Sequence, residues 1–437
     1  MAALEELEVS ALKLHNSEKQ TYQVFLTPRA GKISLANILF LTSTLPRFVG
    51  DQQAAFVLEQ AAAWKRARPD DTLYILAPHD VGAHDTEQID SVTIERFHYM
   101  RPAQLQTLAY PAIMPNLRRK PVRALQIPFY LWNQYRTAKR MIKTHRIDLV
   151  YAHWVMPQGV VADQLKRATG VPYILQNHSS DLSVFTKLGK PGRALARRIL
   201  RRAEAFFCVN SLQREMARDI LPGLACAVLP MGVAMQTPKA PPVTRATDAA
   251  YGVGTISRLS GKKGLDHLIA AAEALAARGQ HPRFAIAGDG EDAERLKALP
   301  QASDVTFPGF LAGAEKLAFF DDCFAMALPS ASTKGDVEGL PVALLEAMAS
   351  GKQVIASRDT NIKLLAEWSE ISGIVEYLDD PSDVDAFARA IMRLLALDPE
   401  VAAQNAQVLA RTAERYRWDN LIEEYLSVID SVQHPGR

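Results

Sequence analysis

The sequence has few cysteines and no long apolar run. Its three cysteines, Cys208, Cys226 and Cys323, lie far apart without the paired spacing of a disulfide framework or a zinc site, which favours a reducing compartment. Every apolar stretch is far shorter than the roughly 18 residues of a membrane-spanning helix. The N-terminal residues MAALEELEVS are acidic and lead into no apolar core, unlike a signal peptide. These absences predict a cytoplasmic protein without an integral membrane segment.

Low-complexity tracts and short-period repeats are also absent, and the composition is that of an ordinary globular protein, with 48% hydrophobic and 22% charged residues. A chain of 437 residues is too long for one core of about 100 to 200 residues. We therefore expect two domains.

The net charge of +2 conceals a basic first half, because residues 35–235 contain 26 Lys and Arg against 15 Asp and Glu. Such an excess indicates an anionic partner, namely phospholipid, nucleic acid or a phosphorylated substrate, although it often serves solubility alone. No zinc, helix-turn-helix or aromatic-basic RNA motif accompanies the charge, so nucleic acid is not expected as a partner.

One expected helix of this half is strongly basic. Two interpretations of it stay open: a solvated crossover helix, or a face that binds anionic lipid at the inner side of the cell membrane, with residues 116–123 contributing. The arginines concerned are Arg193, Arg197, Arg198, Arg201 and Arg202.

Short apolar runs alternate with helical patterns along the first half. Such runs are typical of parallel strands buried on both faces, and the segments between them have the periodicity of crossover helices. Strands are expected at 37–42, 72–78, 149–153, 173–178 and 205–210, and helices at 52–68, 128–146, 158–169 and 192–205.

The same pattern restarts after a segment rich in Pro, Thr and charge, which we interpret as a linker. Strands are expected at 253–256, 283–288, 305–307, 325–329 and 353–357. The predicted fold class is α/β, with two Rossmann-like domains and a last helix that returns to the first domain. The predicted organisation is an extension at 1–34, a first domain at 35–235, a linker at 236–250, a second domain at 251–416 and the returning helix at 417–437.

The most informative segment is 335–357, GDVEGLPVALLEAMASGKQVIAS. A helix is indicated from about Pro341 to just before Gly351, because proline favours the first turn and glycine the position past the end. Its N-terminus presents unpaired N–H groups and the positive end of the helix dipole, which suits a diphosphate. Glu338 and Glu346 flank that terminus, but two glutamates at this spacing mean little alone, since most such pairs lie on solvated faces.

The sequence around these glutamates resembles a known family. EGLPVALLE is similar to the Glu-x7-Glu signature of family 4 glycosyltransferases, which have the GT-B fold of two Rossmann-like domains facing a central cleft. TISRLSGKKG at 255–264 is similar to the family's Gly-Arg-Leu segment, in which Arg258 and Lys263 match, and AGDGEDAERL at 287–296 resembles its Gly-Asp-Gly loop.

The first half contains further matches at 41–57, 152–159 and 177–182. The chain departs from the family at Asp51 and Ser179, where many members have glycine, and at Met231, where asparagine is usual. It also departs at Asp359-Thr360-Asn361-Ile362, where many relatives carry paired glycines.

The resemblance implies a retaining, metal-independent hexosyltransferase that moves a sugar from a UDP- or GDP-sugar to an acceptor hydroxyl in bacterial glycolipid, cell-envelope or exopolysaccharide synthesis. The acceptor is expected to be lipid-linked, a glycan or a small molecule, and no true cofactor is expected. The catalytic residues implied are Glu338, His178, Arg258 and Lys263. The donor-binding residues implied are Glu346, Gly339, Leu340, Pro341, Gly288, Gly290 and Gly50. The acceptor candidates are Asp51, His153 and Asp181.

Two other functions stay open, a nucleotide-sugar epimerase of the same fold and a non-catalytic relative that only binds a nucleotide-sugar. The triplet Asp383-Val384-Asp385 has the Asp-x-Asp spacing with which another transferase class binds manganese. Its place at a helix start favours helix capping instead.

Overall fold

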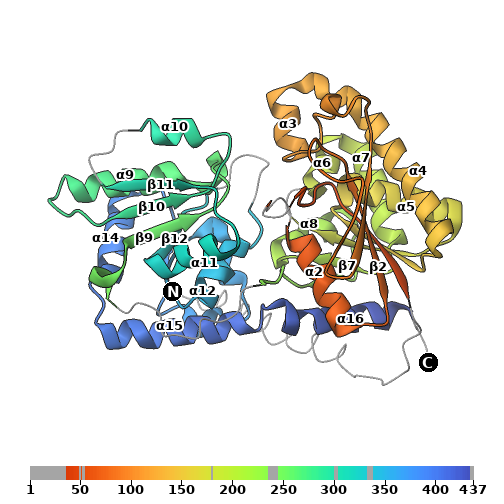
Figure 1. Ribbon diagram of the computed structural model, residues 1–437. Helices are drawn as coiled ribbons and strands as arrows, with labels where there is room; N and C mark the ends of the chain where they lie inside the picture. Colours follow the sequence, from red (N-terminus) through yellow and green to blue (C-terminus); the bar gives the residue numbers. More distant parts are fainter. Residues whose placement is uncertain are drawn as a thin grey trace.

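The computed structural model describes residues 36–48, 51, 55–178, 181–234, 245–299, 304–331 and 338–433. They form two α/β domains that lie beside each other (Figure 1). Two long helices, α15 (Pro399–Glu414) and α16 (Trp418–Gln433), run along one side of the molecule, α15 below the second domain and α16 below the first.

The first domain contains an eight-stranded sheet in the order β3-β4-β2-β1-β5-β6-β7-β8, parallel except for the antiparallel pair β3 and β4. Its central strands are apolar runs without a polar face, because helices cover both sides of the sheet. The strands are β1 (Asn37–Leu41), β2 (Thr72–Pro78), β3 (Thr86–Ile89), β4 (Val92–Phe97), β5 (Leu149–His153), β6 (Tyr173–Asn177), β7 (Phe206–Cys208) and β8 (Ala227–Val228). The helices are α2 (Ala55–Ala67), η1 (Ala103–Leu105), α3 (Ile113–Arg119), η2 (Pro121–Gln126), α4 (Ile127–His145), η3 (Val155–Gly159), α5 (Val160–Thr169), α6 (Asp181–Lys187), α7 (Gly189–Arg202) and α8 (Ser211–Ile220).

The second domain contains a six-stranded sheet, all of it parallel, in the order β11-β10-β9-β12-β13-β14. The strands are β9 (Tyr251–Ile256), β10 (Phe284–Ala287), β11 (Val305–Gly309), β12 (Cys323–Leu328), β13 (Gln353–Ser357) and β14 (Glu376–Leu378). The helices are η4 (Ala246–Asp248), η5 (Gly261–Lys263), α9 (Leu265–Ala276), α10 (Ala293–Lys297), α11 (Gly313–Asp322), α12 (Val342–Ala349), η6 (Arg358–Thr360), η7 (Ile362–Leu364), α13 (Trp368–Ile371) and α14 (Val384–Leu395).

The strand order reverses once in each sheet, between β1 and β5 in the first and between β9 and β12 in the second. In open parallel sheets ligands bind outside the carboxyl ends of the strands at this switch point. The loops that follow these four strands hold most of the residues that the family resemblance implies, including Arg258 after β9 and Glu338 after β12. The topology therefore locates the candidate site before any side chain is considered.

Helix α16 returns to the first domain, as predicted. Trp418 and Tyr425 are buried in the same apolar cluster as β1 and α2, and Gln176 of β6 donates a hydrogen bond to the Tyr425 hydroxyl (2.7 Å). An ion pair joins Arg66 of α2 and Asp419 of α16 at the surface (2.7 Å). The returning helix thus completes the core of the first sheet.

Four strands, β3, β4, β8 and β14, were not predicted, and all of them except β4 lie at the edge of a sheet. The criterion was a continuous apolar run, which selects strands that helices cover on both faces. β4 alternates buried and partly buried side chains, and β3, β8 and β14 are only four, two and three residues long. Edge strands are often short, and β4, the second strand of its sheet, has polar side chains on one partly buried face, so none of the four forms a continuous apolar run.

Candidate active site

The helix expected from Pro341 is α12. Pro341 occupies the N-cap position, and Gly351 has a left-handed φ of 64° just past the last turn. Leu344 and Leu345 are fully buried in the second-domain core, so the helix is firmly held. Because α12 follows β12, its N-terminus lies near the switch point of the second sheet, as the sequence predicts.

The carboxylate of Glu338 lies at the entrance of this helix beside two lysines. Lys263 Nζ is 2.8 Å from Glu338 Oε2, and Lys262 Nζ is 3.9 Å from it. Burial alone would raise the pKa of Glu338, but the two lysines and the Gly339 N–H outweigh it and lower that pKa. Glu338 is therefore an anion held between two lysines.

Glu346, one and a half turns into α12, is also paired. Lys316 Nζ of α11 lies 2.6 Å from Glu346 Oε1, and Glu346 is only 7% exposed. Glu59 of α2 faces this pair from the first domain, and its carboxylate accepts a hydrogen bond from Trp418 Nε1 (3.3 Å). Burial, and then repulsion by Glu346, raise the pKa of Glu59 to about 6. The two domains are thus electrostatically coupled at this point.

Arg258 is directed at a different carboxylate, because its Nη2 lies 2.9 Å from Oε2 of Glu291 in the Gly-Asp-Gly loop. The two glycines of that loop have a packing role. A Cβ at Gly288 would lie 1.8 Å from the Ser257 carbonyl oxygen, and one at Gly290 would lie 2.3 Å from that of Leu259. These glycines allow the loop to pack against the backbone next to Arg258, so they position the arginine.

Asn361 explains one departure from the family. It has a left-handed φ of 59°, a conformation that glycine adopts freely and asparagine tolerates better than most residues. Its side-chain Nδ2 donates to the carbonyl oxygens of Glu338 (2.9 Å) and Gly339 (2.8 Å). Asn361 therefore adopts a conformation that usually requires glycine, and it adds two hydrogen bonds that hold the loop before α12.

His178 lies at the end of β6, in contact with the second domain. A Cβ at Gly339 would lie 3.1 Å from the His178 carbonyl oxygen, so the loop before α12 approaches the first domain here. His178 Nε2 is 3.0 Å from Nδ1 of His153, and Phe56 and Trp154 pack against its ring. Burial lowers the pKa of His178 to about 3, so it is a neutral hydrogen-bonding group at pH 7.

The other first-domain candidates mainly support the loops. His153 is fully buried and holds the His178 ring rather than reaching the surface itself. Asp51 Oδ2 accepts from Arg47 Nε (2.7 Å), and Asp181 accepts from Val155 N (2.7 Å) and from the amide of Asn177. Gly50 lies outside the described residues.

Both domains of the chain are similar to known proteins. Residues 54–236 match the domain described as Glycosyltransferase Family 4, and residues 250–397 match the domain described as Glycosyl transferases group 1. The chain is 30% identical over 282 residues to the putative colanic acid biosynthesis glycosyltransferase WcaL of Escherichia coli, covering 63% of this chain and 67% of that one. The chain belongs to glycosyltransferase family 4.

A second family 4 relative is the GDP-mannose-dependent alpha-(1-6)-phosphatidylinositol monomannoside mannosyltransferase of Mycobacterium tuberculosis, which is 28% identical over 65% of this chain and 76% of the relative. Among solved structures, the trehalose-6-phosphate synthase OtsA superposes with a TM-score of 0.66 at 12% identity, over 91% of this chain and 99% of that chain. This likeness confirms the GT-B fold.

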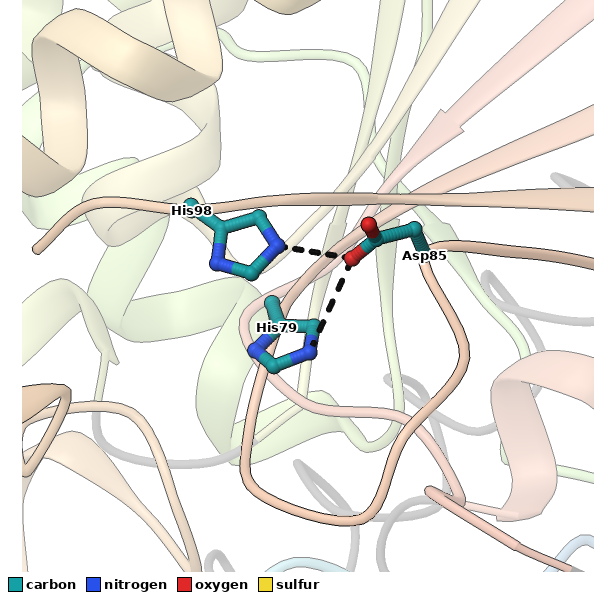
Figure 2. A group of neighbouring side chains, drawn as sticks. All are labelled: His79, Asp85 and His98. Atoms are coloured by element: carbon teal, nitrogen blue, oxygen red, sulfur yellow. Dashed lines mark hydrogen bonds and ion pairs between the residues drawn. The ribbon is translucent and has the colours of Figure 1, made fainter. Parts of the chain in front are cut away.

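Three further side chains of this family 4 chain lie close enough to surround an ion (Figure 2). Asp85 Oδ1 is 2.7 Å from His98 Nε2 and 3.7 Å from His79 Nε2, and the two imidazoles stack with centroids 3.9 Å apart. Gln106 Oε1 accepts from Tyr99 N, so its Nε2 must donate to His79 Nδ1 (2.9 Å). The proton of neutral His79 is then on Nε2, whereas a metal ligand needs a lone pair there and an acceptor for its other nitrogen. The group fits a hydrogen-bonded cluster better than a metal centre.

The Asp-x-Asp triplet of this family 4 chain has the predicted capping role. Asp383 is the N-cap of α14 and accepts from the Ala386 N–H (2.9 Å), and Asp385 forms an ion pair with Arg278.

The basic helix α7 supports the crossover interpretation. Its apolar residues Ala196, Ile199 and Leu200 are buried in the first-domain core. Arg198 and Arg202 both lie 3.0 Å from the fully buried carboxylate of Asp163. Arg193 pairs with Asp219 (3.0 Å), and Arg197 donates to the Ile220 carbonyl oxygen. Most of the arginines of α7 are therefore engaged within the protein, with no apolar face beside them.

Sequence reasoning missed Lys316, Glu59 and Glu291 as members of the site. Lys316 and Glu59 lie on ordinary amphipathic helices, where a single charge carries no positional signal. Glu291 belongs to the Gly-Asp-Gly loop that the resemblance identifies, but the motif gives no separate role to this glutamate. Asn361 had a signal, since it replaces paired glycines of family 4.

Proposed function

We propose that this family 4 chain is a retaining, metal-independent hexosyltransferase that transfers a sugar from a UDP- or GDP-sugar to an acceptor hydroxyl. The acceptor is lipid-linked, a glycan or a small molecule, and the product belongs to bacterial cell-surface polysaccharide or glycolipid. The relatives named above act in colanic acid biosynthesis and on a phosphatidylinositol mannoside, which supports these product classes.

The observation that carries the proposal is the set of paired charges around the N-terminus of α12. Lys263 holds Glu338, Lys316 holds Glu346 and Arg258 holds Glu291, each at 2.6 to 2.9 Å. A diphosphate arriving at the helix N-terminus competes for the cations, because its charge exceeds that of one carboxylate. Released from the lysines, Glu338 is free to accept from sugar hydroxyls and Glu346 from the ribose diol.

The chemical step then needs no protein nucleophile. The bond between the anomeric carbon and the β-phosphate oxygen breaks while the acceptor oxygen forms its bond on the same face of the sugar. The acceptor proton passes to the departing phosphate oxygen. Lys263 and Arg258 stabilise the charge that grows on that phosphate, and the N–H groups of Gly339 and Leu340 add donors. Neutral His178 contributes a hydrogen bond at the sugar.

The first test identifies the donor. UDP- and GDP-sugars are screened by thermal shift, and the sugar that raises the melting temperature is then incubated with candidate acceptors and with excess chelator. Retention predicts a product whose anomeric configuration, read by NMR, matches that of the donor, at a rate that the chelator leaves unchanged. An inverted product, or loss of activity with the chelator that added metal restores, would refute the corresponding part of the proposal.

The second test concerns Arg258. Arg258→Ala should reduce kcat by about 100-fold or more, as when one oxyanion donor is lost. Arg295→Ala is the matched control, since Arg295 is a nearby cation of α10 whose ion pairs with Asp266 and Asp292 lie outside the proposed donor contacts. Equal kinetics in the two variants would contradict the role.

Incubation of the donor without any acceptor separates the alternatives. An epimerase converts the donor sugar to its isomer, and a non-catalytic relative binds donor but transfers to no acceptor. The transferase proposal predicts an unchanged sugar without acceptor and turnover with one.

A further inference from the structure

Exposed apolar side chains of the described residues gather on one segment of the first domain. Six of the fourteen large exposed hydrophobic residues lie between positions 105 and 132. The most exposed are Leu125 (71%), Val122 (68%), Trp132 (58%) and Phe129 (53%), all on η2 and the first turns of α4. Single exposed apolar residues are ordinary, but four on adjacent turns form a patch that signals an interaction.

Cations surround this patch, and acidic residues are missing from its sequence. Residues 96–147 contain eleven Lys and Arg and no Asp or Glu. Arg119 and Lys120 are exposed where α3 meets η2, and Arg136 and Lys143 continue the exposed stripe of α4 beyond Trp132. We call the patch together with these cations the α3–α4 surface.

The backbone of this surface is rigidly attached. The opposite side of α4 is buried through Tyr130, Gln134, Ala138 and Met141. The helix runs along the side of the first domain that faces away from the second (Figure 1). The exposed aromatic side chains are therefore presented by a fixed helix and not by a loop.

We propose that the α3–α4 surface docks this protein on a membrane that contains anionic lipid. A helix that lies in the membrane interface combines bulky apolar side chains, tryptophan among them, with lysines and arginines that reach phosphate headgroups. Each cation near an anionic bilayer adds about 1 kcal/mol of attraction, roughly fivefold in affinity. The arginines of α7 lack this combination, because that helix buries its apolar side.

The docking surface is connected to the candidate acceptor side. Asn116 of α3 donates to the carbonyl oxygen of Tyr110 (2.7 Å), and the Tyr110 hydroxyl donates to the Leu45 carbonyl oxygen (2.9 Å) in the loop after β1. That loop continues to Asp51. If the proposed transferase function holds, this chain of contacts links the docking surface to the loop that carries the acceptor candidate Asp51.

The experiment measures partition of the full chain onto vesicles of phosphatidylcholine alone and of phosphatidylcholine with phosphatidylglycerol, by flotation. We expect binding to the anionic vesicles, weakened by salt, and little binding to neutral ones. Leu125→Ser/Phe129→Ser should lower the partition coefficient by at least about tenfold. The control is Phe310→Ser/Leu317→Ser, which removes two exposed apolar residues of the same types (49% and 47% exposed) from the second domain.

The contribution of the cations is tested with Arg119→Gln/Lys120→Gln, which should lower partition onto the anionic vesicles about 25-fold. Arg193→Gln/Arg201→Gln on α7 is its control and should leave binding unchanged. Trp132 fluorescence reports insertion directly, because its emission should shift to the blue on anionic vesicles and the shift should vanish in Trp132→Phe.

Absent binding of the wild type to anionic vesicles would overturn the proposal, and so would equal losses in the patch variants and their controls. Capture of an acidic protein partner by this surface without vesicle binding would also overturn it. Vesicle binding needs no donor or turnover. A failed transferase assay with intact vesicle binding therefore refutes only the proposed function, and the reverse result refutes only the docking surface.

Discussion

Glu59 provides a stability test of the contact between the two domains. Its pKa is raised from 4.5 to about 6 by burial and by the charge of Glu346 across the interface. A carboxyl group whose pKa is higher in the folded than in the unfolded state stabilises the fold below the unfolded pKa, and that contribution is lost as pH rises through the folded pKa. A shift of 1.5 pKa units, from 4.5 to about 6, corresponds to about 2 kcal/mol. The wild type should thus lose about 2 kcal/mol in all through this group as pH rises from about 3.5 to about 7, most of it between pH 4.5 and pH 6, and Glu59→Gln should not.

The assay is urea denaturation of both proteins at several pH values across this window. Glu423→Gln, at an exposed position of α16, is the charge-matched control, and its difference from the wild type should stay flat. In a Glu346→Gln background the pH-dependent stability difference caused by Glu59→Gln should be smaller, because the repulsion between the two glutamates is removed while the burial of Glu59 remains. A flat difference between wild type and Glu59→Gln from pH 4.5 to 7 would refute the assignment of Glu59 to this contact.

Three further predictions concern the loop before α12. Asn361→Ala should destabilise the second domain by about 2 kcal/mol in denaturation, because two hydrogen bonds to this loop are lost and alanine is strained at the left-handed φ; Asn361→Gly should recover about 1 kcal/mol of that. Gly339→Ala should lower turnover roughly tenfold in initial-rate assays, because its Cβ presses on the His178 carbonyl oxygen and moves the domains apart. Glu338 has a lowered pKa beside Lys263, so its contribution to stability is present above pH 4.5 and lost as pH falls through the folded pKa. Acid unfolding of Glu338→Gln should therefore be shallower than that of the wild type, and an identical acid profile would contradict the ion pair.

The sequence predicted the two sheets because their central strands are short, continuous apolar runs separated by helical periodicity. This pattern follows from burial on both faces and needs no tertiary information. The edge strands β3, β8 and β14 lack the pattern because they are short, and β4 lacks it because one of its faces is only partly buried. The order of the strands in each sheet also cannot be predicted from local sequence, because it depends on how the crossover helices pack on the faces of the sheet.

The sequence indicated which residues belong to the candidate site but not which ion pairs they form. The motif context indicated Glu338, Glu346, Arg258 and Lys263, and the structure places all four around the two strand ends of one switch point. Their present partners were not predictable, because an ion pair such as Lys316 with Glu346 joins positions 30 residues apart with no shared motif. Spacing along the chain cannot encode a contact between two helices that meet only after folding.

The pairing nevertheless follows one physical rule, which also accounts for the missed residues. A pocket that is to receive a diphosphate and a polyhydroxy sugar needs cations and carboxylates in the same small, partly buried volume, and uncompensated charges there would be costly. Each predicted functional charge in the second domain has an opposite charge within 2.6 to 2.9 Å, and Lys316 and Glu291 are the members that complete the set. Glu59 is the exception: its pKa rises because it is buried and because the charge of Glu346 acts on it more strongly than that of Lys316. The contact between the domains is therefore where the charges of this candidate site are least neutralised.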